Sequence, residues 1–205
     1  PKDLLSDGKA FGGRAGVRYD GEARGLGAGV TLAGAASDSL QWLASVQAGR
    51  ARELDNMGEV DTANSTRTRP NPQRDRELSV LGKAVLTPGG GQRHSLTVER
   101  VQKDSEVEVL SGRSPTPTGT LDLDGTADMT RTRLSWDGQW KLGASWADEL
   151  RAVLAWQGAD GREVSTERRT ATPNLRERDV AYKERLWQAV IQAERSGRLN
   201  DEVPS

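Results

Sequence analysis

The sequence contains no cysteine, one histidine and one phenylalanine, and aromatic residues make up 4% of its 205 positions. Without cysteine, the chain has no disulfide framework, no thiolate metal site and no Cys/His catalytic pair. No uninterrupted apolar run approaches the roughly 20 residues that a membrane-spanning helix needs. The net charge of −1 gives no field that would favour nucleic acid as a partner. These absences exclude several classes of function and leave the compartment open.

Apolar residues are also too scarce for an ordinary globular core. They make up 34% of the chain, against 29% charged residues, and the mean hydropathy is −0.70. A disordered chain would lack repeated apolar patterning, yet this sequence alternates apolar and polar residues over long stretches. The strands of a membrane barrel need an apolar residue only at every second position, because the lumen face and the loops can be polar.

The strongest alternation runs from Leu40 to Ala48, where apolar side chains take the even positions and Leu43 is the exception among the odd ones. Such a period of two predicts a β-strand, here over 40–50, with one apolar and one polar face. Seven more strands are expected at residues 11–20, 26–33, 76–87, 93–109, 130–137, 150–157 and 180–195.

Three of these regions are less regular. The phase of the alternation changes within 93–109, which predicts a bulge or an excursion past the membrane edge. Residues 138–149 are expected to hold the end of the sixth strand plus a turn. Residues 180–195 fit a helix as well as a strand, and the pairing expected with the preceding strand favours a strand.

The connections between the expected strands alternate in length. Long loops at one end and short turns at the other are typical of outer-membrane barrels. We therefore predict an all-β fold, an antiparallel up-and-down meander of about eight strands that is part of a larger transmembrane β-barrel. The long polar loops are expected at about 51–76, 111–125 and 158–179, and the short turns at 36–38, 88–92 and near 145.

Aromatic residues lie near the ends of several apolar faces. They suit the two aromatic girdles of a membrane barrel, although tryptophans in the core of a soluble sandwich would also fit. The residues concerned are Phe11, Tyr19, Trp42, Trp136 and Trp156.

No catalytic constellation stands out, so we expect no enzyme and assign no catalytic residue. The only histidine, His94, lies beside a glycine turn and shares the parity of the apolar face. A position at the rim is therefore expected for it, rather than a catalytic or haem-ligating role. The turn at 89–91 joins two strands and opens no helix, which makes it a poor phosphate loop.

Two polar groups remain as candidates for binding. Four carboxylates in the first long loop could bind a cation, but their spacing is not that of an EF-hand, so no metal site is predicted. Five arginines on polar faces would project into a barrel lumen, where they could pair with an internal plug, guide an anionic ligand or simply line a hydrated wall. The carboxylates are Glu53, Asp55, Glu59 and Asp61, and the arginines are Arg14, Arg18, Arg131, Arg133 and Arg151.

Three segments carry a resemblance to a known family: Asp3-Leu4-Leu5, the Arg-x-x-Glu-x-x-Asn-x-Gly run from Arg50 to Gly58, and Arg69-Pro-Asn-Pro72. They resemble the early barrel of TonB-dependent outer-membrane receptors, and the haem/haemoglobin receptor branch most closely. The resemblance covers nearly the whole chain in layout, and its motifs lie in residues 1–20 and 40–87.

The resemblance implies a 22-stranded barrel that is filled by an N-terminal plug and energised by the inner-membrane TonB complex. This chain shows no plug and no TonB box, so residues 1–205 are expected to be a fragment, the N-terminal part of such a barrel. The implied location is the bacterial outer membrane, with lipid, the receptor's own plug and the TonB complex as partners and the long loops outside. Haem, a haem protein or another iron source such as a siderophore would be the transported ligand rather than a cofactor, with unknown binding residues.

Two other interpretations stay open. A complete small eight-stranded outer-membrane barrel with a structural or adhesive role requires the last strand to pair with the first. A soluble all-β carbohydrate-binding domain or enzyme requires the apolar face to pack on a second sheet.

Overall fold

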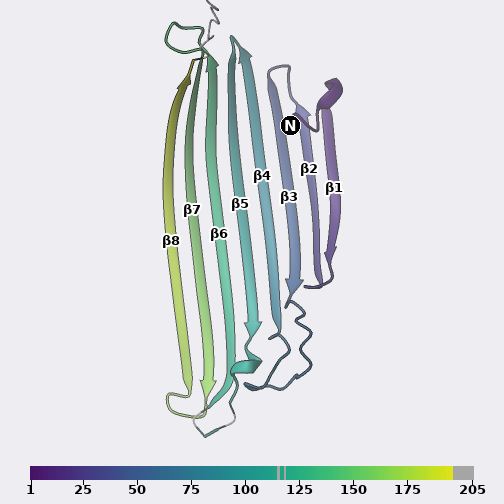
Figure 1. Ribbon diagram of the computed structural model, residues 1–205, viewed down its shortest axis with the longest axis vertical. Coiled ribbons are helices and arrows are strands. Elements are labelled where there is room, and N and C mark those ends of the chain that lie inside the picture. Colours follow the sequence, from purple (N-terminus) through teal and green to yellow (C-terminus); the bar gives the residue numbers. More distant parts are fainter. Residues whose placement is uncertain (115, 118, 196–205) are drawn as a thin grey trace, which may run out of the picture.

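The chain folds as one antiparallel β-sheet whose strands follow each other in chain order (Figure 1). The computed structural model describes residues 1–114, 116–117 and 119–195. Two short 3-10 turns are η1 (Ser6–Gly8) and η2 (Leu110–Gly112). The strands are β1 (Phe11–Asp20), β2 (Gly25–Ala35), β3 (Leu40–Arg52), β4 (Gln73–Gly89), β5 (Gln92–Glu108), β6 (Thr120–Lys141), β7 (Glu149–Arg169) and β8 (Leu175–Glu194).

No helix in the described part of the chain is long and apolar enough to cross a membrane.

The expected all-β up-and-down meander is confirmed. Each strand pairs with its neighbours in sequence, and within the described residues β1 and β8 do not pair, so the sheet is open and has two free edges. Residues 180–195 belong to a strand, as expected, and the turn expected within 138–149 lies at 142–148. The strands lengthen along the chain, from 10 residues in β1 to 22 in β6.

The connections alternate between the two ends of the sheet, as predicted (Figure 1). We call the lower end in Figure 1 the loop end and the upper end the turn end. The loop end holds residues 21–24, 53–72 and 170–174 and the described residues of the connection between β5 and β6, and the turn end holds residues 36–39, 90–91 and 142–148.

Two details of the prediction are wrong, and one of two alternatives is excluded. The long loop expected at 158–179 is a short connection, because β7 continues to Arg169 and β8 begins at Leu175. The loop expected at 111–125 ends earlier, since β6 begins at Thr120. Of the two alternatives for the change of phase within β5, the bulge is excluded, since the pairing with β4 is continuous from residue 107 to residue 94, and an excursion past the membrane edge stays a prediction.

The strand register sorts side chains onto two faces. Odd positions of β1 and β8 share one face with even positions of β2 to β7, and the remaining positions share the other. A hollow of about 520 Å³ on the second face is lined from Arg18 of β1 to Tyr182 of β8. The sheet therefore curves around this second face, which we call the concave face. The opposite face is the convex face.

The sheet is a single layer without a conventional core. Among the described residues, no large side chain is fully buried. The buried positions are mostly small ones on the concave face, such as Ala33 and Thr31, where curvature brings side chains together.

Candidate functional site

A band of apolar side chains crosses the convex face of all eight strands. Its side chains point into solvent, and the most open of them, Ile191, is 79% exposed. A contiguous apolar surface this wide marks a contact with protein or membrane, because soluble monomers rarely expose one. On successive strands the band covers Phe11–Tyr19, Leu26–Gly34, Leu40–Ala48, Leu78–Leu86, His94–Val98, Leu134–Trp140, Leu150–Trp156 and Trp187–Ala193.

The loop-end edge of this band is inclined to the rows of paired residues. Leu26 ends the band on β2, but its β3 partner is Arg50, and the band on β3 ends two residues earlier. Between β4 and β5 the edge moves by four further residues, since Leu78 pairs with Gln102 and the last apolar residue on β5 is Val98. These shifts amount to about 20 Å across a sheet about 34 Å wide, an inclination of roughly 30°. Strands of closed membrane barrels are tilted by a similar angle of about 35–45°.

The height of the band follows from the same geometry. A run of nine residues, as on β1, spans about 26 Å along the strand, or about 23 Å upright at that inclination. The apolar band of outer-membrane barrels is about 25 Å tall. On β1 to β4 the band therefore has about this height, whereas on β5 to β8 its runs of five to seven residues are shorter.

Aromatic side chains mark both edges of the band. At the turn-end edge the rings of Phe11 and Trp42 lie 6.3 Å apart, and at the loop-end edge those of Trp156 and Trp187 lie 6.5 Å apart. The Trp42 indole lies over its cross-strand partner Gly34, where a Cβ would be 2.7 Å from the indole nitrogen. Tryptophan and tyrosine prefer such positions at membrane interfaces.

His94 lies on the convex face at the turn-end edge, so the rim position predicted for it is confirmed. Its ring stacks on Trp136 with 6.0 Å between centroids and meets Trp140 edge-on at 5.3 Å. Within the described residues, no side chain forms a hydrogen bond or ion pair with its imidazole. The histidine is therefore part of an aromatic cluster, and nothing beside it would act as a base or nucleophile.

The concave face is largely polar and carries all five arginines expected to face a lumen. Arg131 forms an ion pair with Glu99 and Arg151 with Asp137, each at 2.6 Å. In the part of the chain that the structure describes, the other three have no ion-pair partner. This face fits a hydrated wall that keeps some positive charge available to a group inside it.

The connections at the loop end are held together as one ordered surface. Hydrogen bonds join the 53–72 connection to both of its neighbours, and the 170–174 connection to the one between β5 and β6. These bonds run from Asp55 N–H to the Glu22 carbonyl (3.0 Å), from Ser111 N–H to Asn71 Oδ1 (3.0 Å) and from Thr170 Oγ1 to the Pro117 carbonyl (2.7 Å).

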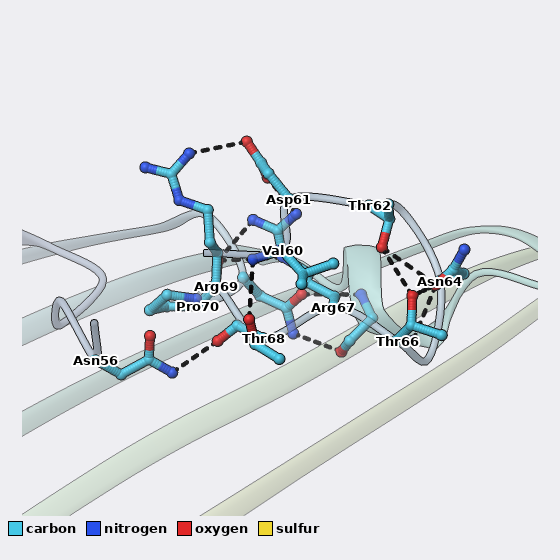
Figure 2. A network of polar contacts seen from close by, with 12 residues as sticks. Asn56, Val60, Asp61, Thr62, Asn64, Thr66, Arg67, Thr68, Arg69 and Pro70 are labelled. Atoms are coloured by element: carbon cyan, nitrogen blue, oxygen red, sulfur yellow. Dashed lines mark hydrogen bonds and ion pairs between the residues drawn. The ribbon is translucent and has the colours of Figure 1, made fainter. Parts of the chain in front are cut away.

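The 53–72 connection itself is an ordered loop, shown in Figure 2. Val60 N–H donates to Thr68 Oγ1 and Thr68 N–H donates to the Val60 carbonyl, both at 3.0 Å. Asn56 Nδ2 donates to the Thr68 carbonyl at 2.9 Å. A Cβ at Gly58 would lie 2.1 Å from that same carbonyl oxygen, so the loop closes in this way only with glycine there. The long polar loop expected from the sequence therefore has a defined conformation, held by hydrogen bonds within the loop.

The four carboxylates considered for a cation do not form a common site. Asp61 pairs with Arg67 at 2.5 Å and with Arg69 at 3.1 Å, and the hydrogen bond from Arg67 is the main cause that lowers the pKa of Asp61. Glu53 accepts a hydrogen bond from the backbone N–H of Gln73 at 3.0 Å, which lowers the pKa of Glu53. Among the described residues, no group of three histidine, cysteine or acidic side chains could hold a metal ion.

Sequence reasoning missed a cluster on the convex face, which we call the arginine group: Arg50, Arg52, Arg74 and Arg76. In the register of β3 and β4, Arg50 lies directly opposite Arg76 and Arg52 lies directly opposite Arg74. All four are exposed and lie just beyond the loop-end edge of the apolar band. The signal was present in the sequence, because the parity of the apolar residues in β3 continues into the two arginines that follow them.

No protein-family model matches the sequence, and no curated protein matches it. The apolar band, the polar concave face and the ordered loop end are therefore the features from which a function is inferred.

Proposed function

We propose that this chain forms part of the wall of a transport barrel in a bacterial outer membrane. The observation that carries the proposal is the apolar band, which lies on the convex face of an open sheet, has aromatic side chains at both edges and is inclined to the strand pairing. In this arrangement lipid contacts the convex face, water fills the concave side and the loop end lies outside the cell.

The single-layer architecture supports lipid as the partner of the band. The soluble alternative needs a second sheet over the apolar face, and the small-barrel alternative needs β8 to pair with β1. Neither contact is present in the described residues. The two edge strands also differ in length, 10 residues in β1 and 20 in β8, so we propose that further strands complete the barrel.

Single-cysteine labelling tests the membrane wall, and the natural lack of cysteine makes each label unique. Neighbouring residues on opposite faces give matched pairs: Val46→Cys with Gln47→Cys on β3, and Val80→Cys with Ser79→Cys on β4. Each labelled chain is folded into phosphatidylcholine vesicles whose acyl chains carry bromine, a quencher of the fluorescent label. The labels at positions 46 and 80 should be quenched and those at 47 and 79 should not. Equal quenching within each pair would contradict the proposal.

We propose further that the barrel is a TonB-dependent uptake receptor and that its ligand is haem, a haem protein or a similar large nutrient. The motifs in residues 3–5, 50–58 and 69–72 support this through their resemblance to that family. The loop that carries two of these motifs exposes Leu54 and Met57, at 63% and 92% of their surface. Exposed apolar side chains on an ordered loop suit contact with the apolar face of a porphyrin.

Titration of the detergent-solubilised chain with haem, followed by the absorbance of the porphyrin, tests this ligand. Replacing Leu54 and Met57 by serine should weaken binding by about tenfold or more, because serine buries much less apolar surface against the porphyrin. Thr62→Ser, in the same loop, should leave the affinity unchanged. Absence of binding by the unaltered chain, or equal binding by all three proteins, would argue against haem.

A further inference from the structure

The arginine group places like charges directly opposite each other on neighbouring strands. Such cross-strand pairs are destabilising unless something compensates them. No ion pair reaches any of the four guanidinium groups within the described residues. Glu53 compensates part of this charge, since the pKa of its carboxyl is lowered by a backbone hydrogen bond and further by Arg24 and Arg52, and the group keeps an excess of positive charge.

Two carboxylates face the group from β5, fewer than its four arginines, and they form no ion pair with it in the described structure. On β5, Asp104 lies opposite Arg76 and Glu106 lies opposite Arg74. A hollow of about 440 Å³ lies among the four guanidinium-bearing residues and is also lined by Arg24, with Asp75 as its one acidic lining residue. Five arginines thus surround a space large enough for a small anionic group.

On β7 and β8, beyond the same edge, the convex-face arginines are neutralised. Arg162 pairs with Asp179 at 2.6 Å, and Arg185 pairs with Asp160 at 3.1 Å, across β7 and β8. Among the described residues, the arginines without an ion pair at this edge therefore lie on β3 and β4, with Arg100 beside them on β5. The positive excess is a property of this site and not of the whole loop-end edge.

The position of the group indicates which anion it would meet. It faces outward and follows the last apolar residues of the band, Ala48 and Leu78, without a gap. Beside a lipid bilayer, this is the level of the headgroups. Guanidinium groups bind phosphate by two parallel hydrogen bonds, which makes arginine well suited to phosphate recognition.

From this geometry we infer that the arginine group binds the phosphate groups of a phosphorylated surface lipid in the outer leaflet. The inference rests on the proposed function, because it takes the apolar band to be the membrane contact. A phosphate held between opposed arginines would relieve their repulsion and fix the vertical position of β3 and β4 in the membrane. It would also attach lipid beside the 53–72 loop.

Two variants with the same charge change test the inference. Arg50→Gln with Arg76→Gln removes one opposed pair, and Arg162→Gln with Arg185→Gln removes two arginines from the same face at the neutralised part of the edge. Each protein is folded into phosphatidylcholine vesicles containing about one tenth of a fluorescent, diphosphorylated disaccharide lipid. Energy transfer from tryptophan to that lipid reports its enrichment around the protein. The dephosphorylated form of the lipid serves as the second probe.

Removing the opposed pair should lower the affinity for the phosphorylated lipid by about fivefold per arginine, hence roughly 25-fold. The Arg162/Arg185 variant should bind nearly as well as the unaltered chain, and the dephosphorylated lipid should show no enrichment around any of the three. Equal binding of the phosphorylated lipid by both variants would overturn the inference. Equal enrichment of both lipids around the unaltered chain would also overturn it.

The same vesicles separate this inference from the proposal that it rests on. The labels at positions 46 and 80 can be quenched by brominated lipid while both arginine variants bind the phosphorylated lipid equally. That result would support the proposed contact of the apolar band with lipid and contradict the headgroup site. If no label is quenched in any protein, both the proposed contact with lipid and the headgroup site that depends on it are contradicted.

Discussion

Placing an arginine at two alanines of β3 measures directly where lipid contacts the sheet. Ala44 lies in the middle of the β3 part of the band, and Ala48 is its last residue before Arg50. Both alanines are exposed on the convex face, so neither substitution displaces a packed side chain. The two positions are four residues apart, about 13 Å along the strand and about 11 Å in depth at an inclination of roughly 30°.

Depth decides the expected cost. On the lipid face of a membrane barrel, arginine costs about 2–4 kcal/mol at the midplane and about 0–1 kcal/mol near the interface. Ala44→Arg should therefore lower the free energy of unfolding by about 2–3 kcal/mol more than Ala48→Arg does. Gln47→Arg, on the concave face of the same strand, should change it by no more than about 0.5 kcal/mol. Urea unfolding of the chain in phosphatidylcholine vesicles, followed by tryptophan fluorescence, gives the three values.

The reasoning fails if the two alanine variants are equally stable. In a sheet surrounded by water, both changes would be surface substitutions worth about 0.5 kcal/mol or less, and depth would have no meaning. A large loss of stability in Gln47→Arg, matching that of Ala44→Arg, would also refute the assignment of lipid to one face only.

Two further predictions concern the ordered loop at 53–72. Gly58→Ala should open the loop at a cost of about 1–3 kcal/mol, because its Cβ would overlap the Thr68 carbonyl, and amide exchange at Thr68 should accelerate at least tenfold. Gly82→Ala is the control, since nothing lies within 4 Å of its Cβ, and equal exchange in the two variants would contradict the steric argument. The lowered pKa of Asp61 means that its ion pairs order the loop fully above the ordinary carboxyl pKa, and that this ordering is lost as the pH falls through the lowered value. Loop exchange, corrected for the intrinsic pH dependence of amide exchange, should therefore accelerate in the unaltered protein as the pH falls below the ordinary carboxyl pKa of about 3.9. Asp61→Asn should show no such step, and the same step in both proteins would place its cause elsewhere.

The sequence was sufficient for the part of the sheet that has one apolar face. In β3, the side chains from Leu40 to Ala48 alternate with a period of two, and a one-residue shift would turn all of them to the other face. Hydropathy therefore predicts the strand, its orientation and the position of His94 at the edge of the band. The alternation of long and short connections then predicted which connections lie at the same end of the sheet.

Beyond the band the same signal disappears. The outer parts of β7 and β8 are polar on both faces, so their composition of arginine and glutamate looked like that of a solvated loop. What holds them together is backbone hydrogen bonding with cross-strand contacts such as the Arg162–Asp179 pair. A pairing of opposite charges 17 residues apart has no period that a hydropathy pattern could reveal.

The concave face explains why the change of phase within β5 involves no bulge. Val101 and Val107 fall out of phase with the apolar residues earlier in β5, and a bulge would have returned them to the convex face. They lie instead on the concave face, and Val101 is buried there by its neighbours. The concave face thus holds occasional apolar side chains where its curvature brings neighbours close. A change in the phase of the hydropathy pattern therefore does not require a change in the register of strand pairing.

The β6–β7 pair keeps a single register from Lys141 opposite Glu149 to Asp122 opposite Arg168, and the β7–β8 pair keeps one out to Arg168 opposite Leu175. Deleting two facing residues from the loop-end tips of β6, β7 and β8 together, beyond the last residue of β6 that pairs with β5, would leave all other partners, and both faces, as they were. At the loop end these strands can therefore lengthen or shorten by two residues at a time, in steps of about 6.6 Å. Insertions and deletions of this kind would change how far the loop end stands above its surroundings, while the apolar band stays in place.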